Sequence, residues 1–462
     1  MDTNWQPALE KASGPRYLAI VRAMADDIAS GRLVNDTRLP TQRELADRLQ
    51  LAIGTITRAY AEAERRGLIR SEGRRGTFVG APQTGRSVLS IIANGSSNAI
   101  DMSKNHPHYA LDPHLPTALR QIARDRNTQR LLEYAPAAGL ARHREAGARW
   151  FAELGAKTEP ESIFVTAGAQ HALSIIVAAE TSPGDTIAAE KLTYPGIKAV
   201  AELLGLQVAG VAMDRDGILP DSLDSVCRQR AVRLLYLNPS LQNPTTSVMS
   251  AQRRKEIADV AERHGVTVIE DEIMRPMMPE HPGYITTLIP DQTYLVMSAS
   301  KAIAAGLRVG FVRAPSKARQ RMIEGLNASC LGIPPLMAEL FAMWQEDGTV
   351  ERTIARRRTE TQARQNIAIT MLKGLVVTGH PASYHVWLEL PEGWTGMKLM
   401  MEAQLRGVAV TPADAFSVEK KPPVEAVRLS IGVPPTRELL RTGLQIITDI
   451  LQGLSGRKMP VV

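Results

Sequence analysis

The stretch from Tyr294 to Arg308 reads YLVMSASKAIAAGLR and decides the fold of most of this chain. A short apolar run ends at Ser298, and Lys301 follows within three residues. An apolar run followed by polar residues is typical of a buried parallel strand, and ligands bind beyond the carboxyl ends of such strands. Lys301 is therefore the first candidate for a functional side chain.

Outward from this stretch, apolar runs of strand length alternate with helical segments through the rest of residues 100–462. This alternation predicts an α/β body with a doubly wound, mostly parallel seven-stranded sheet. The seven runs are Ser162–Thr166, Thr186–Ala189, Gln207–Met213, Val232–Leu237, Val266–Glu270, Tyr294–Met297 and Arg308–Arg313.

The first eighty residues have a different pattern. A helix is expected over residues 17–30, with Ile20, Met24 and Ile28 on one face and Gly31 after it. Thr41 and Glu44 have the spacing of a capping box and begin a short helix that ends near Leu49. After a tight connection over residues 51–54, a third helix should run from 55 to 66, followed by two β-rich segments over 68–79. This order predicts a winged helix-turn-helix.

A winged helix binds DNA, and the charge of this segment is compatible with that partner. Residues 38–80 hold nine basic and five acidic residues, and the whole chain has a net charge of +7. The third helix would enter the major groove while the hairpin tip reaches an adjacent groove. A solvated basic face is the alternative for any single arginine. The candidate DNA-binding residues are Arg43, Thr55, Thr57, Arg58, Arg74, Arg75 and Gly76.

The motifs LPTQRELADRL, GTITRAYAEAERRGLI and GRRGTFV make residues 13–80 similar to the DNA-binding domain of the GntR family of bacterial regulators. The resemblance implies a double-stranded DNA operator as partner. Ala52 and Ile53 stand where the family often has a serine and an arginine, so the family's operator preference does not simply carry over.

Composition along the chain predicts the domain boundaries and the cellular compartment. Residues 1–80 form the DNA-binding domain, residues 81–99 are rich in Ser, Asn, Gly and Ala and form a linker, and residues 100–462 form the body. The sequence has no apolar run long enough for a membrane span and no signal peptide. Its two cysteines indicate neither a disulfide framework nor a metal site. We therefore expect a soluble cytoplasmic protein without a membrane partner or a metal.

The polar clusters after the predicted strands suit pyridoxal 5'-phosphate. Lys301 supplies an amine for a Schiff base, and Asp271 can pair with the ring nitrogen. Asn243 can donate to the ring hydroxyl, Tyr194 can stack on the ring, and Arg428 can hold the carboxylate of an effector. The phosphate would lie against a helix N-terminus, hydroxyls and a guanidinium, supplied by Gly168, Ala169, Gln170, Ser298, Ser300 and Arg308.

In this order the clusters resemble those of the fold-type I aminotransferases over residues 100–455. The resemblance implies that fold, with a smaller C-terminal α+β subdomain, and a homodimer in which Tyr134 reaches the cofactor phosphate of the neighbouring subunit. A GntR winged helix joined to such a body resembles the MocR-type regulators, whose bodies generally sense a ligand. An amino compound or the cofactor itself is thus the expected effector.

Two departures concern catalysis. Ile273 and Met274 occupy the positions where aminotransferases usually have a tyrosine, and Thr246 replaces the usual glycine after Asn243-Pro244-Thr245. We expect cofactor binding without efficient turnover. Two alternatives stay open: an active aminotransferase with an accessory DNA-binding domain, and a body that has lost the cofactor and only dimerises.

Overall fold

The chain divides into two compact units, Met1–Asn94 and Gly95–Val462. The structure is a computed structural model, and it describes residues 5–7, 15–29, 31–34, 37–65, 68–71, 76–79, 100–124 and 128–453. The predicted linker over 81–99, and Arg74 and Arg75 of the predicted hairpin tip, lie outside these residues.

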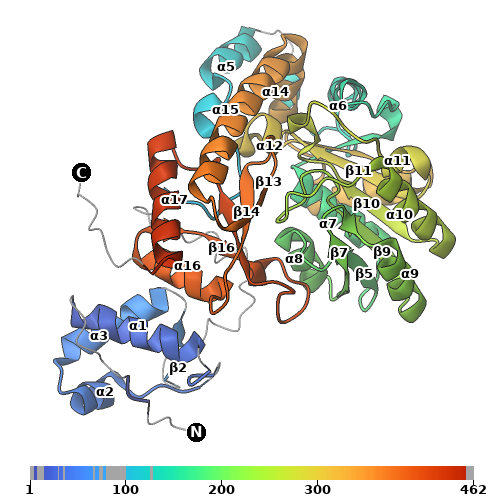
Figure 1. The fold of residues 1–462 in the computed structure, drawn as a ribbon. Coiled ribbons are helices and arrows are strands. Elements are labelled where there is room, and N and C mark those ends of the chain that lie inside the picture. Colours follow the sequence, from blue (N-terminus) through green and yellow to red (C-terminus); the bar gives the residue numbers. More distant parts are fainter. Residues whose placement is uncertain are drawn as a thin grey trace. The chain divides into compact units, whose positions relative to one another are not determined.

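The first unit contains the expected helices and the two β segments (Figure 1). Ile20 and Met24 are fully buried, whereas Ile28 is half-buried. Thr41 and Glu44 form the predicted capping box, with Thr41 N donating to Glu44 Oε2 at 2.7 Å. The elements are α1 (Arg16–Ala29), α2 (Gln42–Leu49), α3 (Ile53–Arg65) and the antiparallel strands β1 (Ile69–Ser71) and β2 (Thr77–Val79).

One boundary in this unit was predicted wrongly. Helix α3 begins at Ile53 and not at Thr55, so Ile53 and Gly54 belong to its first turn and not to the connection before it. Glycine weakens a helix mainly in its interior, and the first turn tolerates it because its N–H groups have no intrahelical acceptor in any case. The shift changes which side chains the tip of α3 presents.

The second unit has at its centre the expected seven-stranded sheet, in the order β4-β12-β11-β10-β9-β5-β6. Every neighbouring pair is parallel except those of β12, which is antiparallel to both β11 and β4. The strands are β4 (Ile163–Thr166), β5 (Thr186–Glu190), β6 (Gln207–Val211), β9 (Val232–Leu237), β10 (Thr267–Asp271), β11 (Thr293–Ser298) and β12 (Gly310–Arg313).

Two strand predictions need correction. The run over 207–213 is interrupted after Val211, and Met213–Asp214 (β7) pairs instead with Gly217–Ile218 (β8). Arg308 does not begin β12, because its backbone is left-handed with φ +50° and the strand starts at Gly310. That turn directs Arg308 toward the neighbouring β4 end rather than into the sheet ladder.

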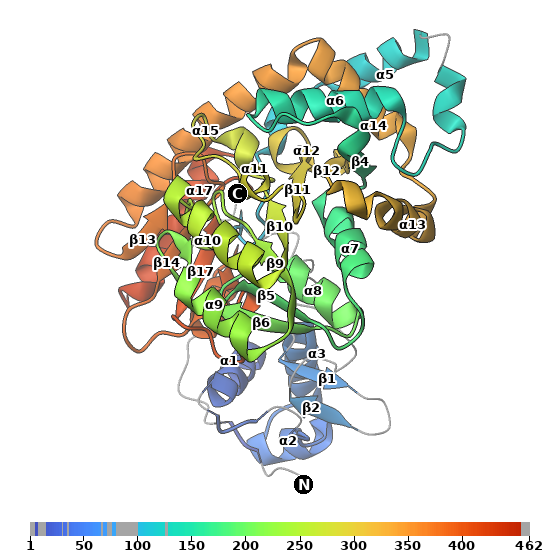
Figure 2. The ribbon, with the colours of Figure 1, turned by 90° about the vertical axis from the view of Figure 1, so that its right-hand side faces the viewer.

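Helices cover both faces of the sheet, as Figures 1 and 2 show. Because side chains alternate along a strand, Leu234 and Tyr236 face one helical layer while Leu235 and Leu237 face the other. The first layer is α7 (Ala169–Glu180), α8 (Pro195–Leu203) and α13 (Arg319–Cys330); the second is α9 (Pro220–Gln229), α10 (Ala251–His264) and α11 (Ile285–Leu288). This is the doubly wound arrangement.

The smaller subdomain is α+β, as expected. Its sheet has the order β13-β14-β17-β16, and the amino-terminal strand of the body, β3 (Ile100–Asp101), pairs beside it with β15 (Val408–Ala409). Its elements are α15 (Thr349–Met371), β13 (Val376–Gly379), β14 (His385–Glu389), α16 (Gly396–Leu405), β16 (Thr411–Pro412), β17 (Ala426–Ser430) and α17 (Arg437–Leu451). The remaining helices of the unit are α5 (Leu115–Arg124), α6 (Ala141–Glu153), α12 (Ala299–Ala302) and α14 (Pro335–Glu346).

No single helix of the described ranges is long and apolar enough to cross a membrane, although Ser316–Cys330 and Pro335–Glu346, bent by 120°, meet the length and composition criteria as a pair. Both cysteines are unpaired; Cys227 is half-buried and Cys330 is exposed.

Candidate functional site

Lys301 lies on α12, directly beyond the carboxyl end of β11. Its Nζ donates to the backbone carbonyl of Asn105, which belongs to the segment after β3. Burial, and then the charges of Arg428 and Arg308, lower the pKa of Lys301 to about 8, while Asp271 opposes this shift. About one molecule in ten of an amine with this pKa is unprotonated at pH 7, and this neutral fraction can act as a nucleophile.

Asp271 ends β10, the strand next to β11, and is almost fully buried. Burial raises its pKa to about 7, and the hydrogen bond from Tyr236 Oη to Asp271 Oδ2, at 2.8 Å, opposes the rise because it favours the ionised form. Asn238 Nδ2 donates to the backbone carbonyl of Asp271 at 2.7 Å and fixes the strand end. The carboxylate is thus held in place and can pair with a protonated nitrogen.

Asn243 and Arg428 meet across the two subdomains. Arg428, on β17, donates from Nη1 to Asn243 Oδ1 at 2.8 Å and from Nη2 to the backbone carbonyl of Ser103. Burial lowers the pKa of Arg428 to about 9, and its guanidinium lies 4.9 Å from the centre of the Phe416 ring. Among the described residues, no partner accepts from the buried Arg428 Nε. This donor is therefore left for a ligand.

Tyr194 precedes α8 and closes another side of the site. Burial, and then the charge of Asp271, raise the pKa of Tyr194 to about 12, so its hydroxyl stays protonated. A Cβ on Gly196 would lie 2.2 Å from the Tyr194 ring, so this glycine leaves room for the ring.

The predicted phosphate residues gather at the N-terminus of α7. Arg308 donates from Nη1 to Ser300 Oγ at 3.1 Å and from Nη2 to the carbonyl of Ala167 at 3.0 Å. Gly168 has φ +82°, and a Cβ there would lie 2.6 Å from Arg308 Nη2. Ser298 Oγ donates to Ser300 Oγ at 3.0 Å. A guanidinium, two hydroxyls and free first-turn amides together form a cradle for an anion.

Gln170 contributes a further polar atom on the same helix. Its Nε2 donates to the carbonyl of Gly196 at 3.0 Å, whereas its Oε1 is buried without a hydrogen-bond partner in the described part of the chain. These residues together fit pyridoxal 5'-phosphate. They provide an anion cradle for the phosphate, a buried carboxylate for the ring nitrogen, and a reactive amine whose pKa is affected by both Arg308 and Asp271.

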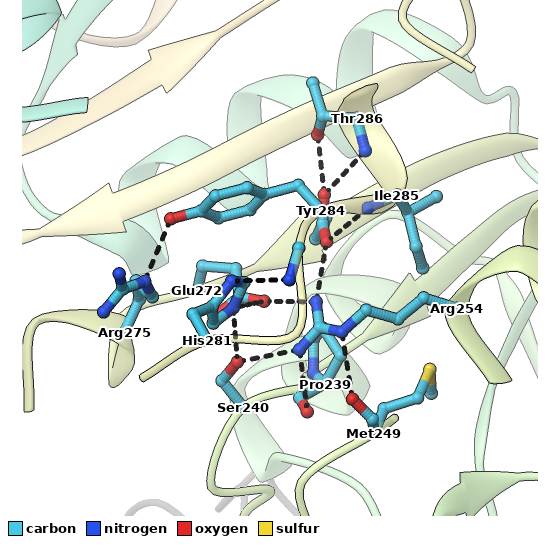
Figure 3. Close-up of polar contacts among 12 residues, drawn as sticks. Pro239, Ser240, Met249, Arg254, Glu272, Arg275, His281, Tyr284, Ile285 and Thr286 are labelled. Carbon is cyan, nitrogen blue, oxygen red and sulfur yellow. Dashed lines mark hydrogen bonds and ion pairs between the residues drawn. The ribbon is translucent and has the colours of Figure 1, made fainter. Parts of the chain in front are cut away.

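A buried ion cluster around Arg254, drawn in Figure 3, includes the two residues that flank Asp271 in sequence. Residues 270 and 272 flank Asp271 and point to the opposite face of the strand. Arg254 Nη1 donates to Glu270 Oε1 at 3.1 Å and to Glu272 Oε1 at 2.8 Å, and its Nη2 donates to Ser240 Oγ at 2.9 Å. Arg254 thereby joins the strand end that carries Asp271 to the loop that carries Asn243.

Sequence reasoning missed several residues of the site. Tyr236 reads as one more apolar position of a buried strand, and no local signal separates its site-facing hydroxyl from a core tyrosine. Asn105 and Ser103 contribute backbone carbonyls, which carry no side-chain signal. Tyr384 Oη donates to the backbone carbonyl of Lys301 at 2.7 Å from the other subdomain.

Tyr134 stands apart from the other predicted residues. Its side chain is 88% exposed, and the neighbouring Leu132 is 83% exposed. Within one chain it is not brought to the site. Its large apolar surface is therefore available to another molecule.

The predicted DNA-binding residues are placed as follows. Arg43, Thr57 and Arg58 are exposed, and Thr55 is half-buried. Thr57 Oγ1 donates to Gln42 Oε1 at 2.8 Å, which joins α3 to α2. Gly76 has φ +110°, and a Cβ there would lie 2.8 Å from Arg38 Nε, so the start of β2 requires glycine.

Comparisons with known proteins agree with both units. Residues 16–79 match the gntR family of bacterial regulatory proteins, and residues 97–447 match aminotransferase class I and II. An uncharacterized HTH-type transcriptional regulator of Bacillus subtilis, YdeF, is 30% identical over 98% of both chains. The 2-aminoadipate transaminase of Thermus thermophilus is 28% identical over 62% of this chain and 73% of its own.

A solved structure gives the same fold for the body. An alpha-aminoadipate aminotransferase from Thermus thermophilus, complexed with N-(5'-phosphopyridoxyl)-L-leucine, matches with a TM-score of 0.73 and 24% identity over 80% of this chain and 95% of that chain. With both units and the full-length relatives in agreement, the chain belongs to the gntR family of bacterial transcription regulators, in the MocR-type group that joins a helix-turn-helix domain to an aminotransferase-like domain.

Proposed function

We propose that the body of this regulator binds pyridoxal 5'-phosphate through Lys301 and senses a small molecule that carries an amino and a carboxylate group. The observation that carries the proposal is the combination of a reactive Lys301 amine with Arg428 Nε, a donor that has no acceptor within the described ranges, in the same buried site. When bound, the cofactor supplies an aldehyde, which condenses with a primary amine and releases water.

Each residue has a role in this proposal. Asp271 pairs with the ring nitrogen, Asn243 donates to the ring hydroxyl through its amide nitrogen, and Tyr194 packs on the ring. Arg428 holds the effector carboxylate. The phosphate is held by the α7 N-terminus and its neighbours, namely Gly168, Ala169, Gln170, Ser298, Ser300 and Arg308.

The switch begins at Lys301 Nζ. An effector amine would compete with Nζ for the cofactor aldehyde, and a released Nζ would be mostly protonated at neutral pH because its pKa is about 8. Tyr384 of the smaller subdomain donates a hydrogen bond to the backbone carbonyl of Lys301, so a movement of the Lys301 backbone would also move or break this contact. To regulate, the effector must bind the two states of the protein with different affinity.

We further propose how two copies of the chain act together on DNA. The protein acts as a homodimer in the cytoplasm on a double-stranded DNA operator with two half-sites, with Tyr134 reaching the phosphate of the neighbouring subunit. Residues 1–80 bind DNA, 81–99 link, and 100–462 sense and dimerise.

The test is a spectral titration of the full chain with pyridoxal 5'-phosphate, followed by a panel of amino acids and amines. We expect a visible absorbance band that Lys301→Ala abolishes, and an effector that changes both this band and the affinity for DNA. A protein that stays colourless in excess cofactor would contradict the cofactor assignment.

Turnover is the second candidate, and the observation that favours it is that Lys301, Asp271 and Arg428 are brought together as a complete set. Sustained keto-acid production from an amino donor and a keto acceptor would establish it. A single stoichiometric conversion would leave the sensor proposal standing.

A further inference from the structure

The tip of α3 has an unusual surface for a helix that enters the major groove. Because the helix begins at Ile53, the exposed residues of its first turn are Ile53, which is 49% exposed, and Gly54, with exposed Ala52 just before them. Thr55 in the same turn is half-buried. A Cβ on Gly54 would meet no atom within 4 Å. The exposed residues at the tip are therefore apolar, and Ile53 is the one with a large side chain.

Two polar side chains near the start of α3 already make contacts within this unit. Arg58 is exposed, but its guanidinium lies 4.2 Å from the centre of the Tyr17 ring on α1. Thr57, one turn after Ile53, donates its hydroxyl to Gln42. The fully buried Ile56, three residues after Ile53, lies on the same side of the helix, so Ile53 is the exposed end of the apolar row that anchors α3 in the core. Ile53 is thus a large apolar side chain that is half exposed at the start of α3.

An apolar side chain in the major groove has one feature to recognise. Each base pair presents hydrogen-bond donors and acceptors there, and only thymine adds a C5-methyl group. Phosphates do not attract an aliphatic side chain, so backbone contact does not explain an exposed isoleucine at this place.

We infer that Ile53 contacts a thymine methyl group and makes the operator half-site select a T·A pair at that position. The inference rests on DNA binding through α3 and adds the base that is read. Buried apolar area is the source of the preference, so the discrimination between thymine and a base without the methyl is modest, about fourfold for one methyl group.

The test begins with selection of binding sites from a random duplex pool by the full-length protein. At each selected thymine, 2'-deoxyuridine then replaces thymidine, which removes only the methyl group. We expect about fourfold weaker binding at one position of the half-site. Ile53→Ala should weaken binding to the thymine site by a similar factor, and deoxyuridine should weaken this variant no further.

Val34→Ala is the matched control, because Val34 is a 64% exposed β-branched residue of the same unit outside its helices. This variant should retain the full difference between thymine and deoxyuridine. Equal losses from deoxyuridine in the wild type and in Ile53→Ala would overturn the inference, as would a selected site without a dependence on any thymine methyl. If no duplex is enriched at all, DNA binding through α3 fails together with the inference. Because Ile53 is a surface residue, unchanged thermal unfolding of Ile53→Ala confirms that it is folded.

Discussion

The charge of Arg428 should control how readily Lys301 reacts. Burial is the largest cause of the low pKa of Lys301, and the Arg428 charge is the next. A pKa of about 8, instead of 10.5, raises the neutral fraction of the amine at pH 7 roughly 300-fold, to about one molecule in ten. Replacing Arg428 with leucine removes the nearby cation, so the pKa of Lys301 should rise by on the order of one unit.

The assay is the rate of covalent attachment of pyridoxal 5'-phosphate, trapped with borohydride and measured by mass over about pH 6 to 9. In the wild type the rate should rise roughly tenfold per pH unit and level off above pH 8, since only the neutral amine reacts. In Arg428→Leu the curve should move to higher pH, with about tenfold slower attachment at pH 7.

Arg428→Lys is the control, because it keeps the positive charge while losing the forked contacts to Asn243 and Ser103. Its profile should stay near that of the wild type. If Arg428→Leu only lowers the plateau and leaves the midpoint in place, the effect is one of geometry, and the electrostatic argument for Lys301 is refuted.

Three further perturbations test the support of the site and the DNA-binding unit. Tyr236→Phe removes a hydrogen bond to the ionised form of Asp271, so the pKa of Asp271 should rise above 7 by about one unit. Cofactor affinity should then fall at neutral pH and recover at higher pH, where Asp271 is ionised again. A loss of affinity that does not depend on pH would contradict this reasoning. Arg254→Met leaves buried carboxylates without their cation and should lower the free energy of unfolding in urea by about 3–5 kcal/mol, whereas Arg352→Met, at an exposed arginine, should change it by less than about 0.5 kcal/mol. Thr41→Ala breaks the capping box and should destabilise the DNA-binding unit by about 1 kcal/mol in calorimetry of the full chain; an unchanged transition would show that the cap is not needed.

The sequence was most informative where a local pattern has one structural solution. The apolar runs that end in polar residues predicted the sheet and placed Lys301 and Asp271 at strand ends; that these two strands are neighbours was learned from the structure. The capping box at Thr41 was predicted because its two hydrogen bonds depend only on residues three apart. These features need no knowledge of the rest of the fold.

Long-range contacts could not be predicted in the same way. Tyr236 lies on β9 and its partner Asp271 on β10, so their hydrogen bond depends on the register of two strands 35 positions apart in sequence. The contact between Arg428 and Asn243 depends on how the smaller subdomain meets the sheet. The start of α3 was misjudged because a glycine read as a helix break lies in the first turn, where its cost is small.

The position of the missing tyrosine connects the site to the switch. Met274 is 2% exposed and belongs to an apolar cluster with Leu241, Met277 and Tyr384, so this side of the site offers no hydroxyl from residue 274. Tyr384 joins this same cluster to the backbone of Lys301. Residue 274 is thus a methionine in the cluster through which Tyr384 contacts the segment that carries the lysine. Under the proposed sensing function, this contact is the route by which a change at Lys301 would reach the smaller subdomain.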